Sequence, residues 1–131
     1  MSRIEELLAK REKVAGWYNA RLIEGVTAPF VAPTTTRASW FVYVVRFAPG
    51  VDRNQVMSRL EERGIPSRPY FTPIHLQPFY RQRFGYAPGD FPVTERVSAS
   101  TLALPFFSNM SEKQVSAVCD ILQEAIVQAR E

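Results

Sequence analysis

The chain has 131 residues, a formal net charge of +3, 46% hydrophobic residues and 22% charged residues. This length suits one domain with one hydrophobic core, and the composition excludes a disordered chain. Because the excess of basic residues is small and the charges are scattered, the sequence also argues against a nucleic-acid-binding protein.

Cys119 is the only cysteine, which excludes an internal disulfide and a zinc site built from several cysteines. The first residues, MSRIEELLAKREK, carry charges where a secretion signal has an apolar core. No apolar run reaches the length that crosses a membrane. We therefore expect a cytoplasmic protein that neither enters a membrane nor binds a metal.

The N-terminal segment predicts a long amphipathic helix from Ser2 to about Glu24, because its apolar residues recur at three- and four-residue steps. Gly25 should end this helix. Residues 27–38 contain Pro29 and Pro33, which favours an extended or irregular connector.

The next segment, residues 39–47, reads SWFVYVVRF and is rich in aromatic and β-branched residues. This composition predicts a strand that is covered on both faces, with Trp40 in the core. Asp52 then stands where it can cap a helix, and Gln55 occupies the position of a capping-box partner. Gly64 should end that helix.

Residues 65–90 form the unusual part of the sequence. Frequent proline prevents a continuous helix and the pairing of an interior strand, so we expect a long ordered loop lined by aromatic rings. Long ordered loops are often functional. The prolines and aromatic residues are Pro66, Pro69, Tyr70, Phe71, Pro73, Pro78, Phe79, Tyr80, Phe84, Tyr86 and Pro88.

The last third predicts a short helix from Pro92 to Ser100, a buried strand over residues 101–104 and a final helix. Ser111 and Gln114 have the spacing of a capping box at the start of that helix. The predicted fold class is α/β, an α+β two-layer sandwich in the order α-β-α-β-α-β-α. Its small, mostly antiparallel sheet has about three strands with helices packed on it.

Several motifs in this order resemble one known family. Residues 64–80 read GIPSRPYFTPIHLQPFY, and residues 84–107 read FGYAPGDFPVTERVSASTLALPFF. An Arg-Pro-Tyr segment, a Pro-x-His-x-x-Pro loop, a Phe-Pro-x-x-Glu helix start and a Leu-Pro-Phe-Phe strand exit follow one another there. The chain resembles the C-terminal small domain of the DegT/DnrJ/EryC1/StrS family of sugar aminotransferases, which share the aspartate aminotransferase fold.

The resemblance implies a dimeric enzyme that uses pyridoxal phosphate. Such an enzyme moves an amino group from an amino acid, usually glutamate, to a keto sugar carried on a nucleotide. Some members of the family perform a dehydration instead, and this alternative stays open. Residues 1–131 would form one domain, with the large cofactor-binding domain of the enzyme absent from the chain.

The chain departs from the family at the catalytic lysine. Its lysines are Lys10, Lys13 and Lys113, and none lies in the serine-rich motif that carries the family's Schiff-base lysine. We therefore expect no catalytic residue, no bound cofactor and no activity of this chain by itself. Its partners would be the missing large domain, a second copy of the enzyme and the nucleotide sugar. A non-catalytic binding or regulatory module derived from this domain is the alternative.

Three residues are candidates for substrate binding: His75, Arg68 and Tyr70. His75 is the only histidine and has no acid or thiol next to it in the sequence, so it forms neither a triad nor a metal site. It is either structural or, as the resemblance implies, a hydrogen-bonding residue near the nucleotide sugar. The guanidinium of Arg68 suits a carboxylate or phosphate, or else pairs with Glu61 or Glu62.

The remaining aromatic residues have two interpretations. The rings of the loop are able to stack on a nucleobase, but packing of the loop itself is favoured. On the first helix, Ile4, Leu7, Leu8 and Trp17 should be uncovered, because that helix would face a body outside this domain. Cys119 should be a small buried hydrophobic residue. The five rings of the loop are Phe71, Phe79, Tyr80, Phe84 and Tyr86.

Overall fold

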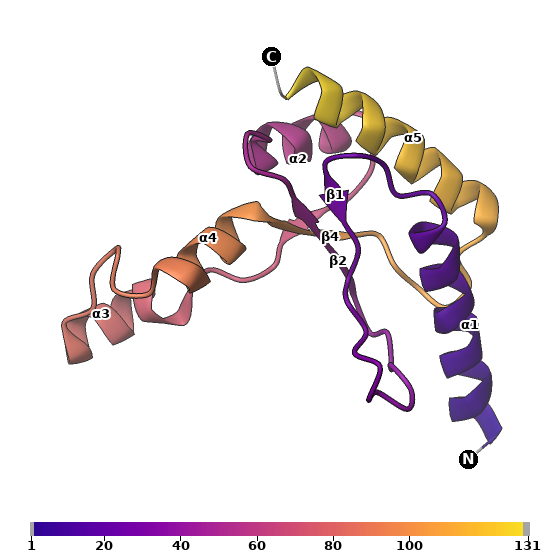
Figure 1. Cartoon of the computed structure of the whole chain (residues 1–131), viewed down its shortest axis with the longest axis horizontal. Coiled ribbons are helices and arrows are strands. Elements are labelled where there is room, and N and C mark those ends of the chain that lie inside the picture. Colours follow the sequence, from indigo (N-terminus) through magenta and orange to yellow (C-terminus); the bar gives the residue numbers. More distant parts are fainter. Residues whose placement is uncertain (1, 130–131) are drawn as a thin grey trace.

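A computed structural model describes residues 2–129 of the chain as helices around a small antiparallel sheet (Figure 1). This confirms the predicted fold class. The elements are α1 (Ser2–Asn19), β1 (Val26–Thr27), β2 (Tyr43–Phe47), α2 (Arg53–Glu62), β3 (Arg68–Pro69), the 3₁₀ turn η1 (Ile74–Leu76), α3 (Pro78–Phe84), α4 (Pro92–Ser100), β4 (Thr101–Leu104) and α5 (Glu112–Gln128).

The sheet has four strands in the order β1-β2-β4-β3, and every neighbouring pair is antiparallel. Tyr43 on β2 lies opposite Leu104 on β4, and Arg68 on β3 lies opposite Ala103 on β4. About three strands were predicted from the sequence, fewer than the four observed, because β1 and β3 have only two residues each. A pattern of alternating polarity cannot be recognised over so short a segment.

Strand β2 is shorter and less covered than predicted. It begins at Tyr43, and Trp40 lies before it with a φ of 50°, in the left-handed region that a strand does not use. Trp40 is half-buried against the core and not inside it. The side chains of β2 alternate, with Tyr43 and Val45 buried and Arg46 exposed, so the prediction of cover on both faces was wrong.

The core lies between the sheet and helices α1, α2 and α5, which pack on one another through α5 (Figure 1). Tyr18 of α1 stacks on Tyr43 of β2 with ring centroids 4.6 Å apart. The Tyr18 hydroxyl donates to the carbonyl oxygen of Pro105 at 2.7 Å, and the Tyr43 hydroxyl donates to Asn19 Oδ1 at 2.6 Å. Both buried hydroxyls are therefore satisfied, and burial raises their pKa values above the ordinary tyrosine value.

The helix ends follow local signals in most cases. The Asp52 carboxylate accepts hydrogen bonds from the backbone N–H groups of Asn54 and Gln55 at 2.8 and 3.2 Å, which caps α2. Gly64 has a φ of 74° and closes the C-terminus of α2 in a Schellman motif, as its N–H donates to Glu61. These two predictions are confirmed. The Gln55 side chain contacts the Asp52 carboxylate instead of the backbone, so this capping box is one-sided.

Helix α5 begins as the sequence predicts, because Ser111 and Gln114 form a complete capping box. Helix α1 ends at Asn19, earlier than the predicted Glu24. Arg21 caps this end, since its guanidinium donates to the carbonyl oxygen of Trp17 and forms an ion pair with Glu112 of α5. Residues 22–25 then lead into β1.

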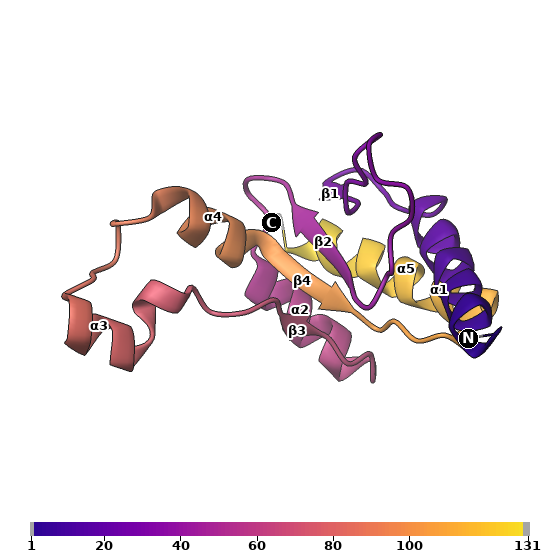
Figure 2. The same ribbon diagram turned by 90° about the horizontal axis from the view of Figure 1, so that it is seen from below.

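Residues 70–100, here named the arm, leave the sheet at β3 and return to it at β4. The arm projects away from the core, as Figures 1 and 2 show for α3 and α4. Its first part was predicted to be a loop, but it contains η1 and α3. Pro78 stands in the first turn of α3, where its missing N–H costs nothing, and Gly85 ends the helix with a φ of 73°.

The surface of α1 is only partly uncovered. Ile4 and Leu7 are exposed by 57% and 42%, as predicted, whereas Leu8 is half-buried. Trp17 is also half-buried, because it packs against the core with Lys13 Nζ at 5.2 Å from its ring centroid. The exposed apolar surface therefore lies near the start of the helix and does not extend to Trp17.

The buried thiol of Cys119 makes the fold less stable at alkaline pH. Burial raises the pKa of Cys119 to about 11 from an ordinary 9.0. The neutral thiol therefore contributes stability that is complete below pH 9.0 and is lost as the pH rises toward about 11.

We expect the free energy of unfolding to fall less steeply with pH in Cys119→Ala than in the wild type over that range. Urea denaturation at several pH values measures both slopes. Tyr18 and Tyr43 titrate in both proteins, and burial, the main cause of their raised pKa values, is common to both, whereas the smaller effect of the Cys119 charge on them is absent from Cys119→Ala. Equal slopes in the two proteins would contradict the assignment.

Candidate functional site

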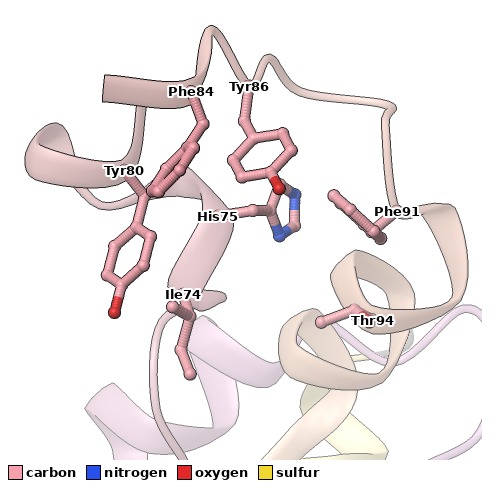
Figure 3. A pocket seen from close by; sticks show the side chains of 7 residues that line it. All are labelled: Ile74, His75, Tyr80, Phe84, Tyr86, Phe91 and Thr94. Carbon is pink, nitrogen blue, oxygen red and sulfur yellow. The ribbon is translucent and has the colours of Figure 1, made fainter. Parts of the chain in front are cut away.

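The arm carries an open hollow of about 420 Å³ with mainly aromatic walls (Figure 3). Four short segments contribute to it: η1, α3, the loop after α3 and the start of α4. An apolar pocket with a few polar groups is the usual form of a small-molecule site. Its lining residues are Ile74, His75, Tyr80, Phe84, Tyr86, Phe91 and Thr94.

His75 is the centre of this hollow and, between residues 66 and 100, the only buried side chain. Its Nε2 lies 2.9 Å from Glu95 Oε1. Its ring lies 4.7 Å from the ring of Phe91 and meets Tyr86 edge-on at 6.4 Å between centroids. Figure 3 shows the imidazole between these two side chains. The ring is thus fixed by one polar and two aromatic contacts.

Glu95, in the first turn of α4, collects several donors on its carboxylate. Besides His75, the backbone N–H of Gly89 lies 2.9 and 3.0 Å from its two oxygens, and the N–H of Phe91 lies at 3.4 Å from Oε1. The hydrogen bond from His75, followed by that from Gly89, holds the pKa of Glu95 below its ordinary value. An ionised carboxylate therefore ties η1, the loop and α4 together.

Glu95 was not predicted as the partner of His75. The histidine has no acid next to it in the sequence, and Glu95 lies 20 residues further along the chain. The signal was present in the Phe-Pro-x-x-Glu motif of residues 91–95, which carries both the ring and the carboxylate that contact His75. Only the fold shows that this motif and the Pro-x-His-x-x-Pro motif form one site.

The aromatic residues of the arm pack on one another, as favoured from the sequence, but they lie outside the hydrophobic core. Phe71, Phe79 and Phe84 are exposed by 73%, 60% and 55%, and Tyr80 and Tyr86 are half-buried. The rings instead form a row in which Tyr80, Phe84, Tyr86 and Phe91 follow one another at centroid distances of 6.1, 5.8 and 5.5 Å. Their faces and edges remain available to a ligand or a protein surface.

A second hollow of about 430 Å³ lies next to the first and shares Ile74 and Thr94 with it. Tyr70 and Phe71 line it, together with residues of α4. Phe71 has a φ of 59°, and the hydroxyl of Ser98 donates to its carbonyl oxygen at 2.8 Å. A bulky residue in this conformation costs about 1–3 kcal/mol, and such strain is concentrated at functional sites.

The three predicted site residues are therefore not gathered in one hollow. His75 lines the first hollow, Tyr70 lines the second, and Arg68 lines neither. Arg68 is exposed on β3. Within residues 2–129 it forms no ion pair with Glu61 or Glu62.

The lysines of the chain do not fit the chemistry of a pyridoxal-phosphate site. Lys10 and Lys13 lie on α1 and Lys113 lies on α5, whereas both hollows are on the arm (Figure 1). Lys10 is also paired with Glu6 at 2.6 Å. No step that needs a lysine at the cofactor can be assigned to these residues.

Among the described residues, no group of three histidine, cysteine or acidic side chains is arranged to hold a metal ion. No helix in residues 2–129 is long and apolar enough to cross a membrane.

The chain is similar in sequence to proteins of sugar metabolism. It is 36% identical over 132 residues to GDP-perosamine synthase of Caulobacter vibrioides, covering 97% of this chain and 34% of that protein. It is 30% identical to the spore coat polysaccharide biosynthesis protein SpsC of Bacillus subtilis, covering 96% and 34%. The chain thus spans about a third of the length of these relatives.

Solved structures agree with this similarity. The aminotransferase TlmJ of Streptoalloteichus hindustanus superposes with a TM-score of 0.79 and 26% identity, covering 92% of this chain and 32% of that one. An aminotransferase of Brucella abortus gives a TM-score of 0.75 and 28% identity, covering 91% and 31%. The model of one family matches residues 1–123. The chain therefore belongs to the DegT/DnrJ/EryC1/StrS aminotransferase family.

Proposed function

We propose that residues 1–131 are the C-terminal small domain of a pyridoxal-phosphate-dependent sugar aminotransferase. The complete enzyme would transfer an amino group from glutamate to a nucleotide-linked keto sugar in the cytoplasm. The match to about a third of GDP-perosamine synthase supports a fragment of such an enzyme, and the name of that relative supports a nucleotide sugar as substrate.

The aromatic hollow around His75 is the observation that carries this proposal. A sugar ring presents C–H groups to aromatic faces and hydroxyls to polar groups, and a nucleobase stacks on aromatic rings. The row from Tyr80 to Phe91 offers such faces beside one imidazole. The arm would form one wall of the active site, which binds and orients the sugar and excludes water from it.

Arg68 and Tyr70 would act at the base of this wall. Arg68 is exposed and unpaired with Glu61 or Glu62 within the described part of the chain, so its guanidinium is available to a phosphate or carboxylate. Pyridoxal phosphate would supply the electron sink for the amino transfer. The residues that hold this cofactor would lie in the other two thirds of the enzyme.

The positions of the lysines give the first test of the proposal that the cofactor site lies outside this chain. When pyridoxal phosphate is added to the chain and the mixture is reduced with borohydride, we expect no lysine to be labelled stoichiometrically. Lys10, Lys13 and Lys113 lie outside both hollows, and labelling should be weak and spread over all three. Mass spectrometry measures it. Complete labelling of one lysine would favour a cofactor site within this chain.

The second test asks whether the arm handles substrate. In a chimera, this chain replaces the matching third of the Caulobacter GDP-perosamine synthase. We expect His75→Ala and Arg68→Ala each to lower kcat/KM for the nucleotide sugar or for glutamate at least tenfold, which corresponds to about 1.4 kcal/mol. The reason is the loss of a polar contact to the substrate.

The matched control for this second test is Arg46→Ala, which removes the same charge from an exposed position on β2. It should leave kcat/KM unchanged. If both His75→Ala and Arg68→Ala retain the full kcat/KM, these residues have no part in substrate binding. An inactive chimera with all residues intact would instead favour the non-catalytic module.

We also propose that the enzyme is a homodimer, and that the isolated chain associates through the start of α1. Ile4 and Leu7 expose apolar surface there, and burying one such side chain contributes about 1.5–3 kcal/mol. Sedimentation over a range of concentrations should show dimers of the wild type and fewer dimers of Ile4→Glu/Leu7→Glu. A chain that stays monomeric at high concentration would refute association through α1.

A further inference from the structure

The two ring nitrogens of His75 have different surroundings. Nε2 lies 2.9 Å from Glu95 Oε1, whereas Nδ1 has no hydrogen-bond partner within residues 2–129. In that part of the chain, the one buried side-chain polar atom without a partner is Ser67 Oγ. Nδ1 is therefore not sealed off by protein, and it remains accessible in the hollow that His75 lines.

The contacts of Glu95 decide which nitrogen carries the proton. An ionised carboxylate only accepts hydrogen bonds, and the donors around Glu95 are the N–H groups of Gly89 and Phe91 besides His75. The lowered pKa of Glu95 agrees with an ionised state at neutral pH. The short contact to Nε2 then requires that Nε2 is the donor.

We propose that Glu95 is a positioning residue that keeps the proton of neutral His75 on Nε2 and leaves Nδ1 as a hydrogen-bond acceptor in the hollow. The ligand group that Nδ1 binds must be a donor. A sugar hydroxyl has this chemistry, and in this respect the inference rests on the proposed function. A carbonyl or phosphate oxygen lacks a proton to donate and does not fit Nδ1 of the neutral ring.

The packing around the ring supports a specific orientation and not only a fixed proton. Phe91 and Tyr86 contact the imidazole, and Phe91 is itself joined to Glu95 by its backbone N–H. Rotation of the ring would break the bond to Glu95. Glu95 thus sets both the tautomer and the direction of Nδ1.

Nitrogen NMR of the chain tests the proposal, because His75 is its only histidine and the ring signals need no assignment to a site. The measurement is made without ligand and is repeated at increasing pH until the nitrogen shifts stop changing, so that the spectra themselves identify the neutral ring. In the wild type we expect Nε2 to show the shift of a protonated nitrogen with slow proton exchange. Nδ1 should show the shift of an unprotonated nitrogen.

Three variants separate a positioning role from a general effect on the arm. Glu95→Ala should move the two nitrogen shifts toward each other and speed the exchange of the ring proton. Glu95→Gln should preserve the wild-type pattern, since its amide oxygen still accepts from Nε2. Asp90→Ala is the matched control, because Asp90 Oδ2 accepts from the Ala87 N–H in the same loop without contacting His75. It should leave both shifts unchanged.

A proton on Nδ1 in the wild type would overturn the proposal, as would unchanged shifts in Glu95→Ala. If Glu95→Ala does not fold, the wild type decides by itself, because fast exchange of the Nε2 proton would show that Glu95 does not hold it. These results do not depend on substrate. The chimera can therefore fail while the tautomer is confirmed, and the reverse is also possible.

Discussion

The position of β4 between β2 and β3 is the constraint on which the rest of the structure depends. Its four residues pair with β2 on one side, and Leu102 and Ala103 also pair with β3 on the other. Leu102 and Leu104 are buried in the core. Both ends of the arm are attached there, since Pro69 lies opposite Leu102. A segment of 31 residues, numbered 70–100, therefore begins and ends on neighbouring strands. The core positions the base of the candidate site without contributing a side chain to it.

Beyond its base, the arm is organised by a polar pair and not by a hydrophobic core. His75 is buried, although Phe84 and Phe91 in the same hollow are exposed. Its polar contact is with the carboxylate of Glu95. Replacing a buried polar pair by apolar residues is often neutral or stabilising, so such a pair is weak evidence for stability. Its value here is geometric, because it brings η1, the loop before α4 and α4 into one arrangement.

Much of the fold could be predicted because its signals are local. The cap at Asp52, the glycine end at Gly64 and the capping box at Ser111 each act within a few residues, and the structure has all three. The two-residue strands β1 and β3 could not be predicted, as their pairing depends on distant partners. The contact between His75 and Glu95 was missed for the same reason. The Pro-x-His-x-x-Pro and Phe-Pro-x-x-Glu motifs were both recognised in the sequence, but their contact is visible only in the folded chain.

The exposure of the arm distinguishes it from the rest of the chain. In the core, Tyr18 and Tyr43 are fully buried with both hydroxyls bonded. In the arm, the rings of Phe71 and Phe79 remain exposed, and Phe71 is also held in a strained conformation. Exposed rings and backbone strain are both costs to the isolated chain. Both costs would be offset where the arm meets a ligand or a further protein surface, as the proposed wall of an active site would.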